Sequence, residues 1–448
     1  GIDAGFDPDA QENLYAGTSA GAASDADTCF NIGIGYSAGS SLNAGDSNVF
    51  LGRAAGKSVT TGSYNTFFGW YSGAAQNSSQ NVMIGTGAGK CAVVGPNNVF
   101  LGSYSGKCNS GGGGYNNFIG NQAGFCNQGS NNNFIGSYAG RCNSTGNDNV
   151  ALGCFSGCAL TEGDANVFLG KGAGKNLTSG SCNIFLGSNA AGSGTVTGAS
   201  NVAIGVDAGC KLSSGVCNVL IGMRAGKCMD TSGYNVAIGV DAGCNANPNS
   251  AGVFIGRGAG QGAGGGENDG FNSVMVGAYA GKNNCGDSNT FIGGCAGCTN
   301  LGGDSNVFIG RAAGVGPTSN SHCFNTYIGC AAGNDQTDGQ RNIIIGCRGS
   351  LPVKDASDQI IFTAGNKFPT PPNSWFYGCC LGGCIITGIG TNYPENAVGA
   401  AITSKLSVGI VSAYKLYGDG SNLSNLPGFS PDAQENLYAG TNAGAASD

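Results

Sequence analysis

A nine-residue phrase recurs along most of this chain and limits the folds that are open to it. The phrase is Asn, three mostly apolar residues, Gly, two variable residues, a small residue and Gly, as in Asn48–Gly56 and Asn166–Gly174. From residue 31 to residue 342 it recurs in 18 steps, so the mean period is about 17 residues. A short repeat of this kind is one structural unit that stacks on its neighbours, because it cannot bury a hydrophobic face alone.

The phrase predicts a strand in every repeat. A period of about 17 is too short for a helical hairpin, and segments such as Val49-Phe50-Leu51, bounded by Asn and Gly, are typical of short strands between tight turns. We therefore predict an all-β fold, a parallel β-solenoid (β-roll) with about 17 residues per coil. About 20 coils stacked about 4.8 Å apart give a rod about 90 Å long.

We number the positions of a repeat from its Asn. Gly at positions five and nine is expected to adopt positive φ, and the Asn side chains are expected to stack from coil to coil.

The extent of the phrase divides the chain into four segments. Residues 1–12 are expected to end a preceding spacer, residues 13–350 to form the solenoid, residues 351–427 to form a small β-rich spacer or cap, and residues 428–448 to begin another cassette. The last expectation follows from Gly5–Asp25, which returns at Gly428–Asp448 with two changes. A spacer at the end of a solenoid covers strand edges that would otherwise pair with other chains.

Two neighbouring positions of the strand, the third and the fourth, are both apolar, although successive strand residues face opposite sides. If the fourth position fills the coil, the aromatic third position points outward and needs a partner, which we expect to be another copy of this chain. A broad coil with two packed layers inside one chain is the alternative. The candidate oligomer face consists of Phe50, Phe67, Phe100, Phe118, Phe134, Phe168, Phe185, Phe254, Phe291 and Phe308.

Cysteine is the strongest chemical signal, because the 21 cysteines fall at recurring positions of the repeat. Stacked coils bring such residues within the Cα distance of a disulfide, about 4.4–6.8 Å. Disulfides between coils indicate an oxidising, extracellular environment. The alternatives are a ladder of unpaired thiols and, less favoured because no His partners recur, metal binding. The predicted pairs are Cys91 with Cys108, Cys126 with Cys142, Cys210 with Cys228, and Cys330 with Cys347.

Composition and the remaining motifs argue against several functions. The net charge of −7 argues against nucleic acid as a partner. No apolar run is long enough for membrane insertion. Glu is scattered rather than clustered, and no motif has the context of a catalytic, cofactor or metal site, so we expect no enzyme activity and no cofactor. Some aromatic side chains are candidates for contact with a cell-surface glycan or, alternatively, for packing between coils or chains: Tyr36, Trp70, Tyr71, Tyr104, Tyr138 and Tyr279.

The phrase resembles the head repeats of trimeric autotransporter adhesins, which form a parallel β-roll from three chains. A closer similarity follows the array, where Thr387–Thr391, Ser404–Val408 and Tyr414–Leu426 resemble the recurring spacer of phage tail-fibre proteins. The resemblance implies a homotrimer, and the return of Gly5–Asp25 at Gly428–Asp448 predicts cassettes that join end to end. The resemblance also implies a non-enzymatic fibre segment, the rigid shaft of an extracellular virion appendage that serves reach and host attachment. The alternative is a bacterial surface filament or adhesin built from tandem solenoid cassettes.

Overall fold

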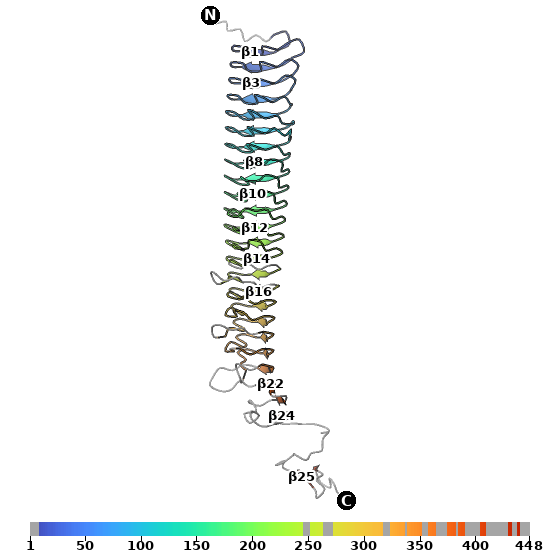
Figure 1. Cartoon of the computed structure of the whole chain (residues 1–448), viewed down its shortest axis with the longest axis vertical. Helices are drawn as coiled ribbons and strands as arrows, with labels where there is room; N and C mark the ends of the chain where they lie inside the picture. The colour runs from blue at the N-terminus through green and yellow to red at the C-terminus, as the bar shows by residue number, and fades with distance from the viewer. Residues whose placement is uncertain are drawn as a thin grey trace.

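The computed structural model describes residues 9–244, 251–262, 272–316, 323–336, 338–351 and 357–363, together with five later strands. These residues are all-β and contain no helix. They form a parallel β-solenoid of about 19 turns with roughly 17 residues per coil, which confirms the fold predicted from the repeat. Figure 1 shows the coils stacked into a straight rod, one strand above the next.

Each repeat contributes one three-residue strand at positions two to four, between the Asn and the first Gly. The strands of the rod are β1 (Leu14–Ala16), β2 (Ile32–Ile34), β3 (Val49–Leu51), β4 (Thr66–Phe68), β5 (Val82–Ile84), β6 (Val99–Leu101), β7 (Asn117–Ile119), β8 (Asn133–Ile135), β9 (Val150–Leu152), β10 (Val167–Leu169), β11 (Ile184–Leu186), β12 (Val202–Ile204), β13 (Val219–Ile221), β14 (Val236–Ile238), β15 (Val253–Ile255), β16 (Val274–Val276), β17 (Thr290–Ile292), β18 (Val307–Ile309), β19 (Thr326–Ile328) and β20 (Ile343–Ile345).

Every strand of the rod pairs in parallel with the strand of the next repeat, and equivalent positions face each other. Between β3 and β4, for example, Val49 pairs with Thr66 and Leu51 with Phe68. The register also holds between β15 and β16, where the repeat is longer than usual. The longer repeat therefore does not shift the register of the ladder.

The first-position Asn side chains form a buried line along the inside of the rod, as the sequence predicted. The Oδ1 atom of Asn132 accepts hydrogen bonds from the backbone N–H and the Nδ2 of Asn149, at 3.0 and 3.2 Å. Asn149 Oδ1 in turn accepts two bonds from Asn166, both at 3.0 Å, and Asn149 Nδ2 donates to the Gly163 carbonyl oxygen at 2.9 Å. Each amide thus ties adjacent coils together and satisfies backbone groups that have no access to water.

Glycine at positions five and nine is required by backbone geometry. Gly153, at position five, has φ +137°, and a Cβ there would lie 2.6 Å from the Gly170 carbonyl oxygen in the next coil. Gly140, at position nine, has φ +54°, and a Cβ there would overlap the ring of Phe134. The first glycine turns the chain at the end of the strand, and the second lets the opposite side of the coil approach the aromatic core.

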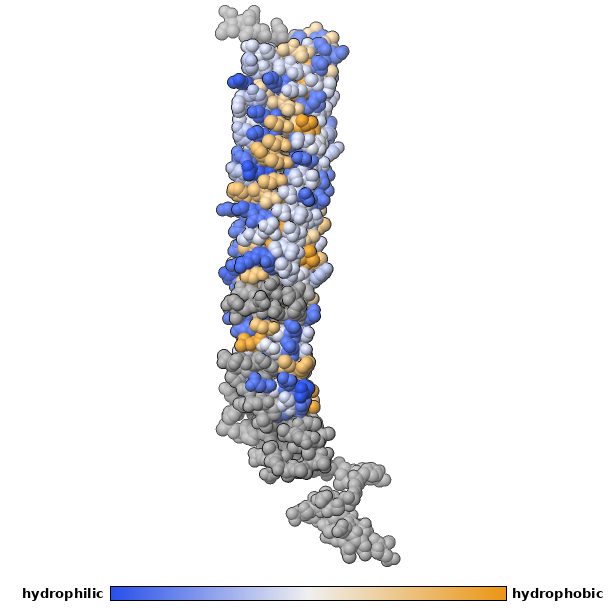
Figure 2. Space-filling view, viewed as in Figure 1, coloured by the Kyte–Doolittle hydropathy of each residue, from blue (hydrophilic) through white to orange (hydrophobic). Residues whose placement is uncertain are grey.

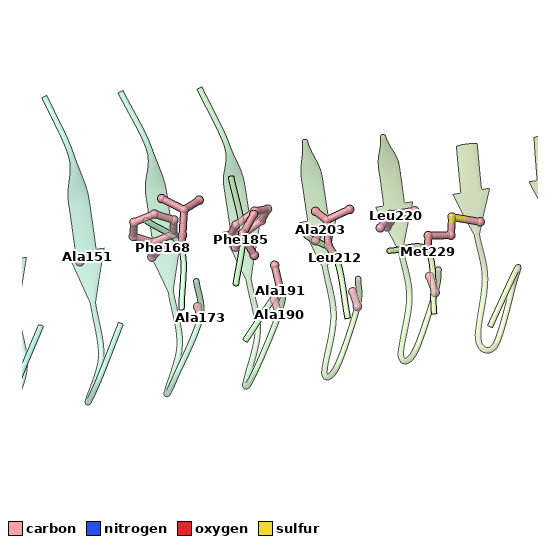
Figure 3. Close-up of a cluster of buried hydrophobic side chains, with 14 of the residues drawn as sticks. Ala151, Phe168, Ala173, Phe185, Ala190, Ala191, Ala203, Leu212, Leu220 and Met229 are labelled. Atoms are coloured by element: carbon pink, nitrogen blue, oxygen red, sulfur yellow. The ribbon is translucent and has the colours of Figure 1, made fainter. Parts of the chain in front are cut away.

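The aromatic third position lies inside the coil, so its assignment to an oligomer face is wrong. Phe254 is 3% exposed and the other members are fully buried: Phe50, Phe67, Phe100, Phe118, Phe134, Phe168, Phe185, Phe291 and Phe308. Neighbouring rings stack along the rod, as in Phe100–Phe118, with centroids 4.8 Å apart and planes 7° from parallel. Small residues at position eight, such as Ala173 and Ala190, close the core from the other side (Figure 3).

The reason for this orientation is the alternation of side chains along the strand. The Asn at position one is buried among backbone groups, and position three, two residues later, must face the same way. Positions two and four consequently face outward. The interior holds the aromatic column, the small residues of position eight and a further apolar column at position twelve, which includes Leu42, Leu160 and Leu212. The third position therefore packs inside one chain, as in the alternative, whereas the fourth position does not.

The parallel ladder continues one strand past residue 350. Strand β21 (Gln359–Thr363) pairs in parallel with β20, and the backbone N–H of Gln359 donates to Asn342 Oδ1 at 2.9 Å, in the place of another Asn. Strands β22 (Ser374–Leu381) and β23 (Cys384–Ile389) follow as antiparallel neighbours, and β24 (Ser404–Val408) pairs in parallel with β23. A separate two-stranded sheet consists of β25 (Phe429–Pro431) and β26 (Leu437–Ala439).

Candidate functional site

Three surfaces of the rod carry side chains that could serve a function. The first is the outer strand face, which we define as positions two and four of β1–β20. No charged residue stands at any of these positions, and Val, Ile and Leu predominate. Leu169 remains 45% exposed and Phe68 54% exposed on this face. Figure 2 shows hydrophobic residues gathered in a band along the rod.

The second surface contains the cysteines at positions ten and eleven, whereas Cys330 and Cys347, the fourth predicted pair, stand at position six. Backbone hydrogen bonds join each of these coils to the next one. The backbone N–H of Cys91 donates to the Lys107 carbonyl oxygen at 2.9 Å, and that of Cys142 donates to the Cys158 carbonyl oxygen at 3.1 Å. The predicted pairs therefore come from directly stacked coils. None of the pairs is bonded in this structure, since free thiols are found at Cys91, Cys108, Cys126, Cys142, Cys210, Cys330 and Cys347.

The environment of two thiols disfavours their thiolate form. Burial, followed by the neighbouring thiols Cys108 and Cys142, raises the pKa of Cys126. Burial and then Cys142 act in the same direction on the pKa of Cys158. Because the thiolate is the reactive form, a raised pKa lowers the rate of disulfide formation at neutral pH. The pairing, including Cys210 with Cys228, stays a prediction for an oxidising environment.

The third surface lies on the turns after the strand and combines aromatic rings with cations. Lys90 Nζ lies 4.7 Å from the ring centroid of Tyr71, and Lys107 Nζ lies 4.8 Å from that of Tyr104. Farther along, Tyr138 stacks on Phe155 with centroids 4.8 Å apart. We call this surface of residues 31–182 the ring–cation stripe. Its members in contact are Tyr36, Arg53, Trp70, Tyr71, Lys90, Tyr104, Lys107, Phe125, Tyr138, Arg141, Phe155 and Lys175.

The structure brings five of the six predicted sugar-contact rings onto this stripe, and Tyr279 occupies an equivalent place farther along, between Arg257 and Lys282. The cations and the rings of Phe125 and Phe155 were not among the predicted contact residues. The signal was present in the repeat, because every Lys and Arg of residues 31–182 stands at position six or ten: Arg53, Lys57, Lys90, Lys107, Arg141, Lys171 and Lys175.

Carboxylates in the same part of the rod lie near the end of each repeat, away from the stripe. Asp46 Oδ1 accepts a hydrogen bond from the backbone N–H of Cys29 at 2.8 Å, and Asp164 Oδ1 accepts one from that of Asn147 at 2.7 Å. These aspartates therefore bind the turn of the preceding coil. Positive and negative charges are consequently separated onto different sides of the rod.

In the part of the chain that the structure describes, no group of three or more His, Cys, Asp or Glu side chains could hold a metal ion, and no helix could cross a membrane. Comparison of the chain with protein-family models, curated proteins and solved structures finds no match.

Proposed function

We propose that this chain is a non-enzymatic structural fibre segment, the rigid shaft of an extracellular virion appendage such as a phage tail fibre. The observation that supports this most directly is the unbroken parallel register from β1 to β21. A chain of this size folded into a compact domain would be far shorter than the rod, which extends about 90 Å for about 19 turns. Reach is therefore the mechanical property that the fold provides.

Rigidity supports the same function. Each coil is fixed to the next by strand pairing, by the buried Asn amides and by backbone bonds on the turn side, such as Gly39 N–H to the Ala55 carbonyl oxygen at 2.9 Å. Bonds on several sides of a coil resist bending in every direction. A shaft that holds a binding tip away from a particle needs this property.

Self-association through the outer strand face completes the proposal. The face is about 90 Å long and about 10 Å wide, so it offers roughly 900 Å² per copy. A typical stable interface buries about 800 Å² per partner, whereas the largest apolar patch of an ordinary monomer is about 300–600 Å². A second copy has the same strand spacing, so its side chains can interdigitate along the whole length. We propose that the fibre is a homo-oligomer, a trimer in the arrangement implied by the resemblance, with cassettes joined end to end.

Immunogold electron microscopy on the native source tests the location. With antibody raised against residues 31–350, label along the appendages of virus particles is expected. Label on filaments that leave cells, without particles, would instead support the bacterial surface filament or adhesin. Label confined to the cell interior would contradict both extracellular functions.

A further inference from the structure

The ring–cation stripe carries positive charge on a chain that is acidic overall. Residues 31–182 contain seven of the 19 basic residues and four of the 26 acidic ones, a net charge of +3 in a chain of net charge −7. All seven basic residues stand at positions six and ten of the repeat, on the turns after the strand, whereas the four acidic residues stand near the end of the repeat. The local field of the stripe is therefore positive along its length.

The cations of the stripe have no carboxylate partner. The ion pairs found in the described residues are Arg224–Asp241 and Arg341–Asp358, and both lie outside the stripe. Lys90, Lys107 and Lys175 lie over aromatic rings instead. A ring holds a cation in place without neutralising its charge, so each ammonium group stays available to an anion.

Rings and cations alternate without a gap over several coils. Lys107 lies near Tyr104 and also near Phe125, at 4.8 and 5.4 Å from the two centroids. Arg141 continues the series, 5.7 Å from the centroids of both Phe125 and Tyr138. From Arg53 to Lys175 the stripe covers seven coil steps, about 34 Å. A ligand that uses the whole stripe must be extended, linear and anionic.

The density and placement of the charges favour an acidic sugar polymer over nucleic acid. Duplex DNA carries about one charge per 1.7 Å, about 20 charges over this length, which far exceeds the seven cations. In an acidic sugar the anionic group sits on the same ring that presents apolar C–H groups. Each sugar residue therefore presents a charge beside an apolar surface, and each ring–cation pair of the protein does the same.

We propose that the ring–cation stripe binds an extended acidic polysaccharide along the rod axis. The ammonium and guanidinium groups of Lys90, Lys107, Arg141 and Lys175 bind its carboxylate or sulfate groups, and the adjacent rings contact the C–H faces of its sugars. This interaction goes beyond the mechanical shaft function and does not depend on it. It makes the side of the fibre, as well as any tip, a surface that adheres to acidic glycans.

The test measures binding of the full chain to immobilised alginate, which is carboxylated, and heparin, which is sulfated, at low and high salt. The variant Lys90→Gln/Lys107→Gln/Arg141→Gln is expected to bind about 10-fold or more weakly and to show a smaller salt dependence. The matched control, Lys211→Gln/Lys227→Gln/Arg311→Gln, changes the same number of cations in other coils and is expected to bind as the unaltered chain does. Preference for one polymer identifies the anionic group.

The ring variant Tyr104→Ala/Tyr138→Ala separates sugar contact from charge alone. It is expected to weaken binding to both polymers while the melting temperature confirms that the rod is folded. Equal loss in the two cation variants, no loss in the stripe variant, or tighter binding of oligo(dT) than of either polysaccharide would overturn the proposal. None of these results depends on whether immunogold labelling finds the chain on virions.

Discussion

Asn149 shows how one buried amide stabilises the stacking of coils. Its side chain and backbone make hydrogen bonds to Asn132, Asn166 and the Gly163 carbonyl oxygen. The variant Asn149→Ala leaves several of these buried groups without partners, and each unsatisfied group costs about 1–3 kcal/mol. We expect the variant to lower the free energy of unfolding by about 2–4 kcal/mol in urea titrations. The control is Asn121→Ala, an exposed side chain with one long bond of 3.4 Å, and a loss of similar size there would contradict this assignment.

Phe118 tests the orientation of the aromatic position. It stands at position three and is fully buried between Phe100 and Phe134. Phe68 stands at position four of another repeat and is 54% exposed on the outer strand face. Phe118→Ala is expected to destabilise the rod by about 3–5 kcal/mol, as for other buried aromatic residues. Phe68→Ala is expected to cost much less. Equal losses in chemical denaturation would show that the third position does not form the core.

Cys244 makes the stability of the rod sensitive to alkaline pH. Burial is the main cause that raises its pKa to about 11 from the ordinary 9.0. An unfolded chain therefore loses this proton at lower pH than the folded chain. Its contribution to stability is complete below pH 9 and disappears as the pH rises from 9 to about 11.

The variant Cys244→Ala is therefore expected to reduce the fall in the urea midpoint between pH 8.5 and 10.5. Cys217→Ala, at an exposed thiol, serves as the control and is expected to leave the slope of that fall nearly unchanged. An unaltered slope in the Cys244 variant would show that other groups cause the alkaline loss.

The repeat predicted the wrong orientation for the core residues. Stacking of the Asn amides from coil to coil, which was also predicted, requires position one to face inward. The same alternation places Phe50 inward at position three and Leu51 outward at position four. The two expectations were therefore inconsistent. Leu and Ile at the fourth position therefore lie on the outer strand face and not in the core.

At the scale of the coil, the glycine that ends each strand permits close stacking of the backbone. A Cβ at Gly153 would lie 2.6 Å from the Gly170 carbonyl oxygen, and neither backbone can move without breaking the ladder. Gly153→Ala is expected to lower the unfolding midpoint strongly, because strain from positive φ and overlap with backbone combine. Gly112→Ala has positive φ, at +73°, but no atom within 4 Å of the added Cβ. It is expected to cost only about 1–2 kcal/mol, and a similar loss at both sites would contradict the close-contact argument.

The end of the solenoid shows why boundaries are harder to predict than the repeat itself. The phrase ends with the repeat of Asn342, but Gln359 takes the place of the next Asn and Thr363 that of the next Gly. The backbone N–H of Gln359 donates to Asn342 Oδ1 as that of an Asn would, so a paired strand forms without the phrase. The exact phrase does not indicate this strand, whereas the alternation in Gln359–Thr363 could have indicated it.

For the whole molecule, the repeat predicted the rod but not the function of its sides. Each side of a coil becomes a continuous surface once the coils stack, so a residue type at one position of the repeat is multiplied along the rod. Lys90 and Tyr71 are nearly 20 residues apart in sequence, and their contact arises only from the stacking of consecutive coils. The ring–cation stripe therefore required the structure, while the columns that compose it were already visible in the sequence.

The outer strand face gives a prediction for the assembly state of the whole molecule. If the face is covered by further copies, light scattering on the purified chain should give a multiple of the 44.1 kDa monomer mass.

A charged variant tests the same face. Replacing Leu101 and Leu169, which face outward on it, with Lys would place unpaired charges in the interface at a cost of several kcal/mol. The variant Leu101→Lys/Leu169→Lys is expected to give the monomer mass and an unchanged β-sheet spectrum. The matched control, Ser103→Lys/Ser137→Lys on the turn side, is expected to stay associated. A monomer mass for the unaltered chain would refute self-association through this face, and the rod would then act as a single-chain shaft.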